Sequence, residues 1–294
     1  MTVINKIIDG KMYAEKLLGE IHPLSKGFLD NFNRKPCLTV ILVGDNPASK
    51  IYVKNKILIA KKIDIESREI LLGSDVTEDE LIHHISILNK DPNVDGILVQ
   101  LPLPKHINEE KILMMVNPDK DVDGFHPFNF GKMAQNMDSF IPATPYGIIE
   151  LIDRYGIETE GKNTVVIGRS NIVGRPMSIL MSNKSEPGNS TVTLVHSRTP
   201  DIPSFTKKAD IIIIALGIPN FLKSEMIKQD SVVIDVGITR VEDKTKARGY
   251  RIVGDVDFES VKNKVSHITP VPGGVGPMTI AMLLKNTLKA RKNN

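Results

Sequence analysis

Short apolar segments alternate with helical ones along this chain, and this alternation constrains the fold more than any other feature. Apolar segments rich in Val, Ile and Leu occupy residues 38–43, 69–72, 96–100, 164–167, 191–195, 211–215 and 232–236. Runs of this length and composition are typical of buried β-strands. Strands separated by helices form parallel sheets with helices on their faces, so the sequence predicts an α/β fold. The last four segments are apolar along their length, which favours the centre of a sheet.

Capping residues and periodicity predict the helices between these strands. Helices are predicted over residues 46–62, 144–155, 174–182 and 279–289. Thr77 and Glu80 form a capping-box pattern at the start of another helix. Residues 121–147 are rich in Asp, Pro, Asn and Gly and have no clear period, so a loop and domain connection is predicted there.

The composition excludes several classes of function. The chain has 294 residues, enough for two domains, and a formal net charge of +3. So small a charge, with 5% aromatic residues and no Trp, argues against nucleic-acid binding. No apolar stretch is long enough to span a bilayer and no signal peptide is recognisable, so a soluble cytoplasmic protein without membrane attachment is expected. The single cysteine, Cys37, excludes an internal disulfide and is expected to be buried.

A glycine-containing turn between a predicted strand and a predicted helix indicates a nucleotide site. The turn reads Gly168-Arg169-Ser170-Asn171-Ile172-Val173-Gly174. A Rossmann fold places its pyrophosphate-binding turn here, where glycines allow close backbone approach and helix N–H groups face an anion. The spacing differs from G-x-G-x-x-G, so an ordinary strand-to-helix turn is the alternative. Gly217 and Gly237 each follow a later strand, on the same predicted rim.

The residues after the second strand of that series favour NADP over NAD. NAD-selective Rossmann folds usually carry Asp or Glu at this point, whereas a basic residue suits the 2′-phosphate of NADP. Here the sequence is His196-Ser197-Arg198-Thr199. Ser197 and Arg198 offer donors, and Arg169 is a second candidate for the phosphate. A solvated loop charge is the alternative for Arg198.

Tyr52 and Lys56 stand four residues apart on a predicted helix, so they share one face. A partly desolvated lysine has a lowered pKa and is able to transfer protons near neutral pH. The Tyr-x-x-x-Lys spacing also occurs in short-chain dehydrogenases, but there it follows the nucleotide turn, whereas here it precedes that turn. An ordinary amphipathic helix surface is the alternative. Gln100 ends a predicted strand, where α/β proteins build their sites.

Two aspartates, Asp121 and Asp123, lie in the polar connection that follows. A carboxylate there is able to bind a cation or to accept two hydrogen bonds from an amino-pyrimidine edge. No metal site is predicted, because the aspartates have no accompanying set of histidines, and His83-His84 is interpreted as helix surface. The run Pro272-Gly273-Gly274-Val275-Gly276-Pro277 suggests a fixed loop with close backbone approach, and a plain linker is the alternative.

Taken in order, these motifs resemble those of the bifunctional methylenetetrahydrofolate dehydrogenase/methenyltetrahydrofolate cyclohydrolase family. The matching segments cover nearly the whole length: Tyr52-x-x-x-Lys56, Val99-Gln100-Leu101-Pro102-Leu103-Pro104, Asp121-Val122-Asp123-Gly124, Gly168-Arg169-Ser170-x-Ile172-Val173-Gly174-x-Pro176, His196-Ser197-Arg198-Thr199, Asp235-Val236-Gly237, Gly254-Asp255-Val256 and the run from Thr269 to Thr279. Family members often have Cys where this chain has Ala143 and Val195, and neither position is a proposed catalytic group.

The resemblance implies two domains with one shared active site in the cleft between them. Residues 1–145 would form an α/β parallel-sheet catalytic domain that binds folate, with the C-terminal helix 279–294 packing back on it. Residues 146–278 would form a Rossmann-type NADP-binding domain. Such enzymes are typically homodimers through the nucleotide-binding domain. The family oxidises 5,10-methylenetetrahydrofolate with NADP to the methenyl cation, and then hydrolyses the cation to 10-formyltetrahydrofolate.

The expected roles follow from the resemblance. Lys56 would be the acid/base of hydrolysis with Gln100 hydrogen-bonded to it, Asp123 would orient the pterin-like ring, and Tyr52 would pack on or hydrogen-bond to the folate. Pro272 and Gly273 would supply backbone contacts to the same ligand. The residues expected at the cofactor are Gly168, Arg169, Ser170, Ile172, Val173, Gly174, Ser197, Arg198, Gly217, Gly237 and Ile238. Two alternatives stay open: a dehydrogenase without the hydrolase step, and an NADP-sensing binding protein without chemistry.

Overall fold

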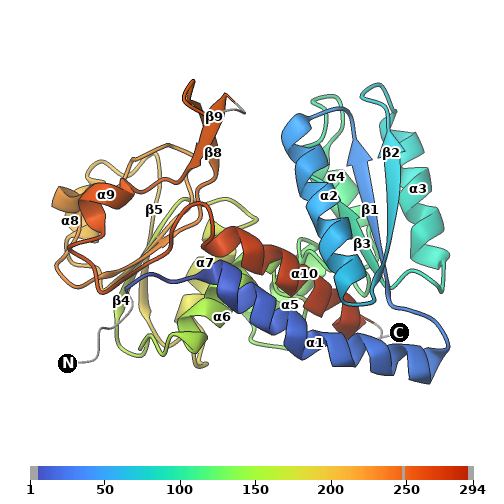
Figure 1. The fold of residues 1–294 in the computed structure, drawn as a ribbon, viewed down its shortest axis with the longest axis horizontal. Helices are drawn as coiled ribbons and strands as arrows, with labels where there is room; N and C mark the ends of the chain where they lie inside the picture. Colours follow the sequence, from blue (N-terminus) through green and yellow to red (C-terminus); the bar gives the residue numbers. More distant parts are fainter. Residues whose placement is uncertain (1–5, 247–248, 291–294) are drawn as a thin grey trace. The chain divides into compact units, whose positions relative to one another are not determined.

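The computed structural model describes residues 6–246 and 249–290, which divide into two compact units (Figure 1). The N-terminal unit comprises the described residues of 15–143 and 280–294, and the C-terminal unit those of 1–14 and 144–279. The division falls inside two helices, α1 (Gly10–Phe32) and α10 (Val275–Ala290). Each unit has its own parallel sheet, which confirms the predicted α/β class.

Three parallel strands in the order β2-β1-β3 form the sheet of the N-terminal unit. These are β1 (Cys37–Val43), β2 (Glu66–Leu72) and β3 (Gly96–Val99). The helices α2 (Pro47–Lys62) and α3 (Glu78–Lys90) follow β1 and β2 and lie on opposite faces of the sheet (Figure 1). The predicted capping box is confirmed: Thr77 Oγ1 accepts the N–H of Glu80, and Glu80 Oε2 accepts the N–H of Thr77.

The core of the N-terminal unit lies between β1 and α3. Ile41 and Val43 of the strand pack in one cluster with Leu81 and Ile85 of the helix. Cys37 belongs to the same cluster and is fully buried, as predicted. Burial raises the pKa of its thiol to about 11, so the group stays in the unreactive protonated form at neutral pH.

The connection between the two sheets is more regular than the sequence predicts. It contains α4 (Glu109–Met115), α5 (Pro127–Ala134) and the start of α6 (Ala143–Arg154). The prediction of a loop over residues 121–147 is therefore wrong for α5. That helix has eight residues and buries only Asn129 and Met133, so it is too short to show a helical period.

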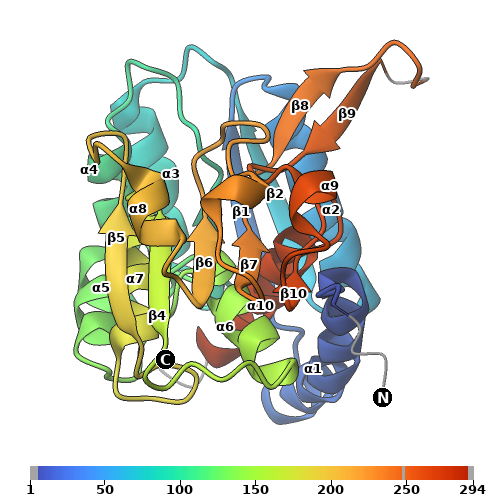
Figure 2. The ribbon, with the colours of Figure 1, turned by 90° about the vertical axis from the view of Figure 1, so that its left-hand side faces the viewer.

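Five parallel strands in the order β10-β7-β6-β4-β5 form the sheet of the C-terminal unit (Figure 2). They are β4 (Asn163–Ile167), β5 (Thr191–Val195), β6 (Ile211–Ile214), β7 (Val232–Asp235) and β10 (His267–Ile268). The strands β4, β6 and β7 are central, as predicted. The same prediction is wrong for β5, which lies at the sheet edge with only its last residue buried, because no further strand pairs with its outer side among the described residues.

The start of the described chain pairs with the other edge of this sheet. Ile7 forms a parallel bridge with Ile268 of β10, and the N–H of Ile8 donates to the Ile268 carbonyl at 2.8 Å. These backbone bonds explain why the segment before Glu15 groups with the C-terminal unit, although the sequence-based boundary assigns it to the N-terminal domain.

The remaining elements of the C-terminal unit are short helices and a separate two-stranded sheet. They are α7 (Gly174–Ser182), α8 (Ile202–Thr206), the 3₁₀ turn η1 (Ser224–Met226), the antiparallel pair β8 (Thr239–Glu242) and β9 (Tyr250–Val253), and α9 (Phe258–Val261). The last helix, α10, begins at Val275, four residues before the predicted start. Pro277 stands in its first turn, where the missing N–H costs no helical hydrogen bond. Among the described residues, no helix is long and apolar enough to cross a membrane.

Candidate functional site

Lys56 and Gln100 meet at the carboxyl end of the N-terminal sheet. Lys56 comes from α2, which follows β1, and Gln100 directly follows β3. The side chain of Lys56 is buried, at 7% exposure, and its Nζ donates to Gln100 Oε1 at 3.0 Å. The amide nitrogen of Gln100 donates to the Leu101 carbonyl at 2.7 Å, which fixes the amide so that its oxygen faces the lysine. The expected hydrogen bond between Lys56 and Gln100 is therefore present.

Burial and Asp123 have opposite effects on the pKa of Lys56. Burial lowers the pKa of the Lys56 ammonium, because desolvation disfavours its charged form, and the Asp123 carboxylate raises it. Burial raises the pKa of Asp123, and Lys56 lowers it in turn. Each group thus helps to keep the other ionised. The arrangement gives a lysine whose pKa lies below the usual range, as proton transfer near neutral pH requires.

Asp123 stands on a segment that runs beside β3. Asp121 forms a parallel bridge with Ile97, and the Ile97 N–H donates to the Lys120 carbonyl at 2.8 Å. Asp123 follows two residues later, towards the end of β3 that carries Gln100. The bridge therefore explains how a residue more than sixty positions after Lys56 reaches the same place.

Asp121 stabilises the turn that follows the Asp121–Asp123 motif, a role that is not expected from the sequence. Its Oδ1 accepts the N–H of Phe125, and its Oδ2 accepts the N–H of His126 and the side-chain amide of Asn129. Its side chain is buried, and this burial raises its pKa to about 7. The two aspartates of the motif thus differ: Asp121 holds the following turn through hydrogen bonds, whereas Asp123 interacts electrostatically with Lys56.

A second support of the Asp123 segment comes from the end of the chain. The side-chain amide of Asn286 in α10 donates to the carbonyls of Val122 at 2.9 Å and Ile141 at 3.0 Å. Asn286 is buried, and it belongs to none of the motifs identified in the sequence. Its polarity at a buried position of an otherwise apolar helix face was the only available signal.

The other predicted substrate residues lie in different places. Tyr52 is on α2, one turn before Lys56, and is 36% exposed. Pro272 and Gly273 belong to the C-terminal unit, whereas Lys56 belongs to the N-terminal unit. The predicted fixed loop around Gly273 is real: the Gly273 carbonyl accepts the N–H of Lys11 at 2.9 Å, and a Cβ on Gly10 would lie 1.8 Å from the Gly274 oxygen.

The turn after β4 has the close approaches that the sequence predicts. A Cβ on Gly168 would lie 2.4 Å from the Ala215 oxygen, and its φ is +115°. A Cβ on Gly174 would lie 2.0 Å from the Gly168 oxygen. Ser170 Oγ accepts the N–H of Val173 at 3.2 Å, so the turn is closed at the start of α7. Only glycine fits these positions, and the backbone of the turn is held tightly against the sheet.

The side chains of this turn are divided between surface and core. Arg169, Ser170 and Ile172 are exposed, whereas Val173 is buried. Only the exposed members are therefore open to a ligand through their side chains, and Val173 is restricted to a packing role. The turn after β5 carries Ser197 and Arg198, both exposed. Because β4 and β5 are neighbours in the sheet, these two turns emerge side by side at its carboxyl edge.

The remaining predicted cofactor residues follow β6 and β7. Gly217 and Ile238 are exposed, and Gly237 is buried. All the predicted cofactor positions therefore stand at the carboxyl ends of strands in one sheet, where open α/β sheets bind their ligands.

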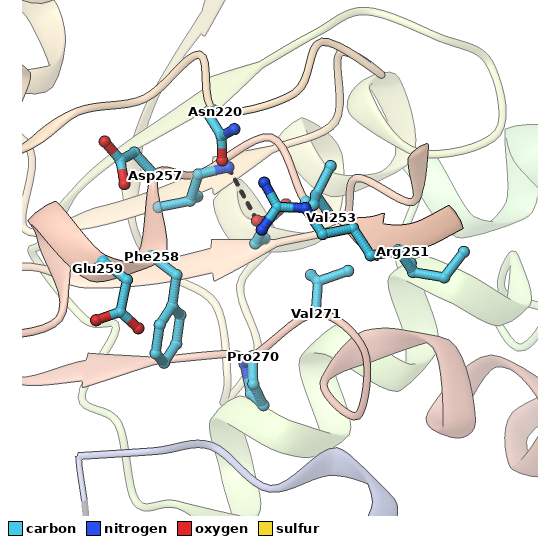
Figure 3. Close-up of a pocket in the computed structure, with 12 residues that line it drawn as sticks. Asn220, Arg251, Val253, Asp257, Phe258, Glu259, Pro270 and Val271 are labelled. Atoms are coloured by element: carbon cyan, nitrogen blue, oxygen red, sulfur yellow. Dashed lines mark hydrogen bonds between the residues drawn. The ribbon is translucent and has the colours of Figure 1, made fainter. Parts of the chain in front are cut away.

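A cavity of about 480 Å³ lies in the C-terminal unit, beside the segment after β9 (Figure 3). It is lined by residues of β9, α9 and the neighbouring loops, among them Arg251 of β9, Phe258 of α9, and Asn220 and Pro270. None of the predicted cofactor or substrate residues lines it. Among the described residues, no group of three or more His, Cys, Asp or Glu side chains is arranged to hold a metal ion.

Comparison with known proteins gives matches over both units. Residues 8–123 match the family model described as "Tetrahydrofolate dehydrogenase/cyclohydrolase, catalytic domain", and residues 142–294 match the NAD(P)-binding domain of the same family. The "Bifunctional protein FolD" of Flavobacterium johnsoniae is 60% identical over 98% of this chain and 97% of its own length.

Two solved structures share the fold over nearly the whole chain. The FolD methylenetetrahydrofolate dehydrogenase/cyclohydrolase of Campylobacter jejuni has a TM-score of 0.91 and 48% identity, covering 98% of each chain. The Trypanosoma brucei enzyme, solved with NADP cofactor and inhibitor, has a TM-score of 0.92 and 37% identity, covering 98% of this chain and 97% of its own.

Proposed function

Because this chain belongs to the tetrahydrofolate dehydrogenase/cyclohydrolase family, we propose that it oxidises 5,10-methylenetetrahydrofolate with NADP and then hydrolyses the 5,10-methenyl product to 10-formyltetrahydrofolate. One observation carries this proposal: buried Lys56, held by Gln100 and balanced by Asp123, lies within the segment that matches the catalytic domain. A protein that only senses NADP has no need of a buried lysine with a lowered pKa in its other unit.

The C-terminal unit fits a dinucleotide. Gly168 and Gly174 leave no room for a Cβ, so the backbone of their turn lies close to the sheet, and Arg169 and Ser170 face outwards. At the start of α7 the N–H groups of Gly174 and Arg175 donate to Ser170, and Pro176 has none, so a pyrophosphate would be met by the exposed residues of the preceding turn. When bound, NADP supplies the acceptor for the hydride that leaves the folate methylene carbon. The protein has to hold the two reactants at near-contact distance.

We assign the proton transfers of hydrolysis to Lys56. Water adds to the methenyl carbon, loses a proton, and the adduct collapses with cleavage of one carbon–nitrogen bond as that nitrogen gains a proton. A lysine with a lowered pKa is able to accept the first proton and return the second. Gln100 keeps Nζ in place for both transfers through its 3.0 Å hydrogen bond.

Substrate orientation falls to the neighbours of Lys56. In this proposal the Asp123 carboxylate accepts two hydrogen bonds from the amino-pyrimidine edge of the folate, which requires the ionised form that Lys56 favours. Tyr52, one helical turn away, packs on or hydrogen-bonds to the folate. Pro272 and Gly273 supply backbone contacts from the loop before α10.

We further propose a homodimer formed through the C-terminal unit. The edge strand β5 supports it, since a sheet edge presents N–H and C=O groups that a second copy is able to pair. Sedimentation equilibrium should give twice the 32.5 kDa of one chain. A mass of one chain at micromolar concentration would reject the dimer without affecting the proposed chemistry.

The test of the activity follows two absorbances in one assay. Purified protein with NADP and methylenetetrahydrofolate should produce NADPH, and added methenyltetrahydrofolate should disappear faster than in buffer alone. NADPH formation without faster methenyl decay would establish a dehydrogenase lacking the hydrolase step. Binding of NADP with no turnover of either folate would establish a binding protein.

A further inference from the structure

Asp235 joins two segments of the C-terminal unit that are separated in sequence. It is the last residue of β7 and is 3% exposed. Its Oδ1 accepts the N–H groups of Gly237 and Asp255, each at 2.9 Å, and its Oδ2 accepts that of Val256 at 2.9 Å. One carboxylate therefore holds both its own turn, after β7, and the segment that follows β9.

Asp255 extends this connection to a third segment. It is fully buried, and its Oδ2 accepts the N–H groups of Leu216 at 2.6 Å and Gly217 at 2.9 Å, in the turn after β6. Within the described residues, its Oδ1 has no hydrogen-bond partner. The two aspartates thus link the turns after β6 and β7 through five backbone hydrogen bonds.

The glycines of the same two motifs make room for these carboxyl groups. A Cβ on Gly237 would lie 2.4 Å from Asp255 Cγ and Oδ1, and a Cβ on Gly254 would lie 1.9 Å from Asp235 Oδ2. Each carboxyl group occupies the space that a side chain would need at the glycine of the other motif. The motifs Asp235-Val236-Gly237 and Gly254-Asp255-Val256 therefore interlock, and the conformation of each depends on the other.

Apolar packing alone does not hold the segment after β9. Gly254 and Val256 are among the residues that line the cavity of about 480 Å³ (Figure 3), and Val256 also packs in the hydrophobic core of this unit with Leu222. Backbone bonds also tie this segment to the chain after β6: the N–H of Asn220 donates to the Gly254 carbonyl at 3.1 Å, and Leu222 exchanges hydrogen bonds with Asp255 and Asp257. Hydrogen bonds therefore act together with packing to fix this geometry.

Two buried carboxyl groups side by side are unfavourable for stability. Burial and the neighbouring Asp255 raise the pKa of Asp235 while three backbone donors oppose the shift, and the resulting pKa is about 6. Hydrophobic residues would fill such a space at lower cost. Because this pair binds the turns after β6 and β7, where Gly217, Gly237 and Ile238 stand, it points to a role in binding the ligand that those turns receive.

We propose that Asp255 and Asp235 are positioning residues that hold the turns after β6 and β7 in the conformation that binds the nicotinamide half of NADP. The inference rests on the proposed function, and it takes the nicotinamide to lie over the edge formed by Gly237 and Ile238, two of the expected cofactor residues. The aspartates are buried and do not touch the ligand. They act through the backbone of Gly217 and Gly237, whose N–H groups they fix.

The test compares dehydrogenase activity with hydrolase activity in the same variant. Dehydrogenation uses NADP, whereas hydrolysis of the methenyl cation does not, so loosened cofactor turns should affect only the first. Asp255→Ala removes the acceptor for both N–H groups after β6 and should lower dehydrogenase kcat/KM for NADP at least about ten-fold. Hydrolase activity should stay within about two-fold of wild type.

The conservative variant tests hydrogen bonding rather than bulk or fold. Asp255→Asn keeps one oxygen that is able to accept from both Leu216 and Gly217, so it should recover most of the activity that Asp255→Ala loses. The affinity for NADP alone, from titration calorimetry, should follow the same order. Glu259→Ala is the matched control: it removes an exposed carboxylate that lines the neighbouring cavity and should leave both reactions unchanged.

Several outcomes would overturn the positioning role. A parallel fall of both activities in Asp255→Ala would indicate general destabilisation, and unchanged NADP affinity would remove the aspartate from the cofactor site. If Asp255→Ala fails to fold, Asp235→Asn replaces it in the same comparison of the two activities. In this variant at least one backbone donor of Asp235 would face an amide NH₂ instead of an acceptor oxygen. Absence of either activity in the wild-type protein would instead reject the proposed function.

Discussion

Lys56 Nζ lies 3.0 Å from Gln100 Oε1 and donates a hydrogen bond to it, although the two residues come from different elements of the N-terminal unit. The bond holds the ammonium group by a neutral partner rather than by a carboxylate. A neutral acceptor positions the lysine without raising its pKa as strongly as an ion pair would. This relationship makes the protonation of Lys56 the most informative quantity to measure.

Replacing Gln100 by Glu should shift the pH dependence of hydrolysis. A carboxylate at this position favours the ammonium form, so the pKa of Lys56 rises. We expect the limb of the pH–rate profile that belongs to Lys56 to move to higher pH. Gln100→Met, which removes the acceptor without adding charge, should not move it upwards. An unchanged profile for Gln100→Glu would assign that limb to another group.

Replacing Lys56 by Met should abolish hydrolysis and leave NADP binding intact. A general acid/base contributes about a hundred- to ten-thousand-fold in rate, and Lys56 lies in the unit that does not contain the nucleotide turn. Methenyl decay and NADP affinity are the two measurements. Lys54→Met is the control, because Lys54 is an exposed lysine on the same helix. Wild-type hydrolysis by Lys56→Met would exclude Lys56 from the mechanism.

Replacing Asp123 by Asn should weaken folate binding far more than NADP binding. The amide presents one donor where the carboxylate presents only acceptors, and a mismatched donor in a buried site costs about 1–3 kcal/mol. The KM for methylenetetrahydrofolate should therefore rise about ten-fold, with the KM for NADP unchanged. Asp119→Asn, at an exposed position in the same connection, should behave as wild type. An unaltered folate KM in Asp123→Asn would contradict the orienting role.

NADP should be used at least about ten-fold more efficiently than NAD, because one charge-assisted contact to the 2′-phosphate contributes roughly 1.5–3 kcal/mol. Arg169 and Arg198 are both exposed, and no ion pair of either is found among the described residues. Measuring kcat/KM for both cofactors on wild type, Arg169→Ala and Arg198→Ala identifies the arginine that holds the phosphate. Equal efficiency of wild type with the two cofactors would reject the preference.

The stability of the protein should fall as the pH rises through the range in which Asp121 titrates. Folded Asp121 keeps its proton up to about pH 7, whereas the unfolded chain releases it near pH 3.9. Between these values the folded state binds more protons, so the free energy of unfolding decreases with pH by up to about 1.4 kcal/mol per unit.

Urea unfolding at pH 5, 6, 7 and 8 measures this dependence. Asp121→Asn carries no titrating group at this position and should show a shallower decline than wild type, even if it is less stable at every pH. Asp119→Asn provides the exposed comparison. Identical slopes for wild type and Asp121→Asn would show that the Asp121 pKa is close to its usual value.

Local sequence determined the features that depend on neighbouring residues. The capping box of Thr77 and Glu80, the buried strand that begins at Cys37, and the glycine-dependent turn at Gly168 all follow from short-range patterns. Buried strands and tight glycine turns can be predicted from the sequence, because apolar runs and a residue without a Cβ each have few alternative explanations. The resemblance of the motifs added the chemistry expected of Lys56, Gln100 and Asp123.

Only the tertiary structure decided what depends on distant segments. Asp121 and Asp123 are indistinguishable in sequence. In the structure Asp121 is enclosed by donors from α5 and its preceding turn, whereas Asp123 interacts electrostatically with Lys56. Asp235 and Asp255 stand twenty residues apart, and their shared role arises because β6, β7 and the segment after β9 meet at one edge. Desolvation and hydrogen bonding depend on which groups surround a side chain after folding, and no local pattern specifies those neighbours.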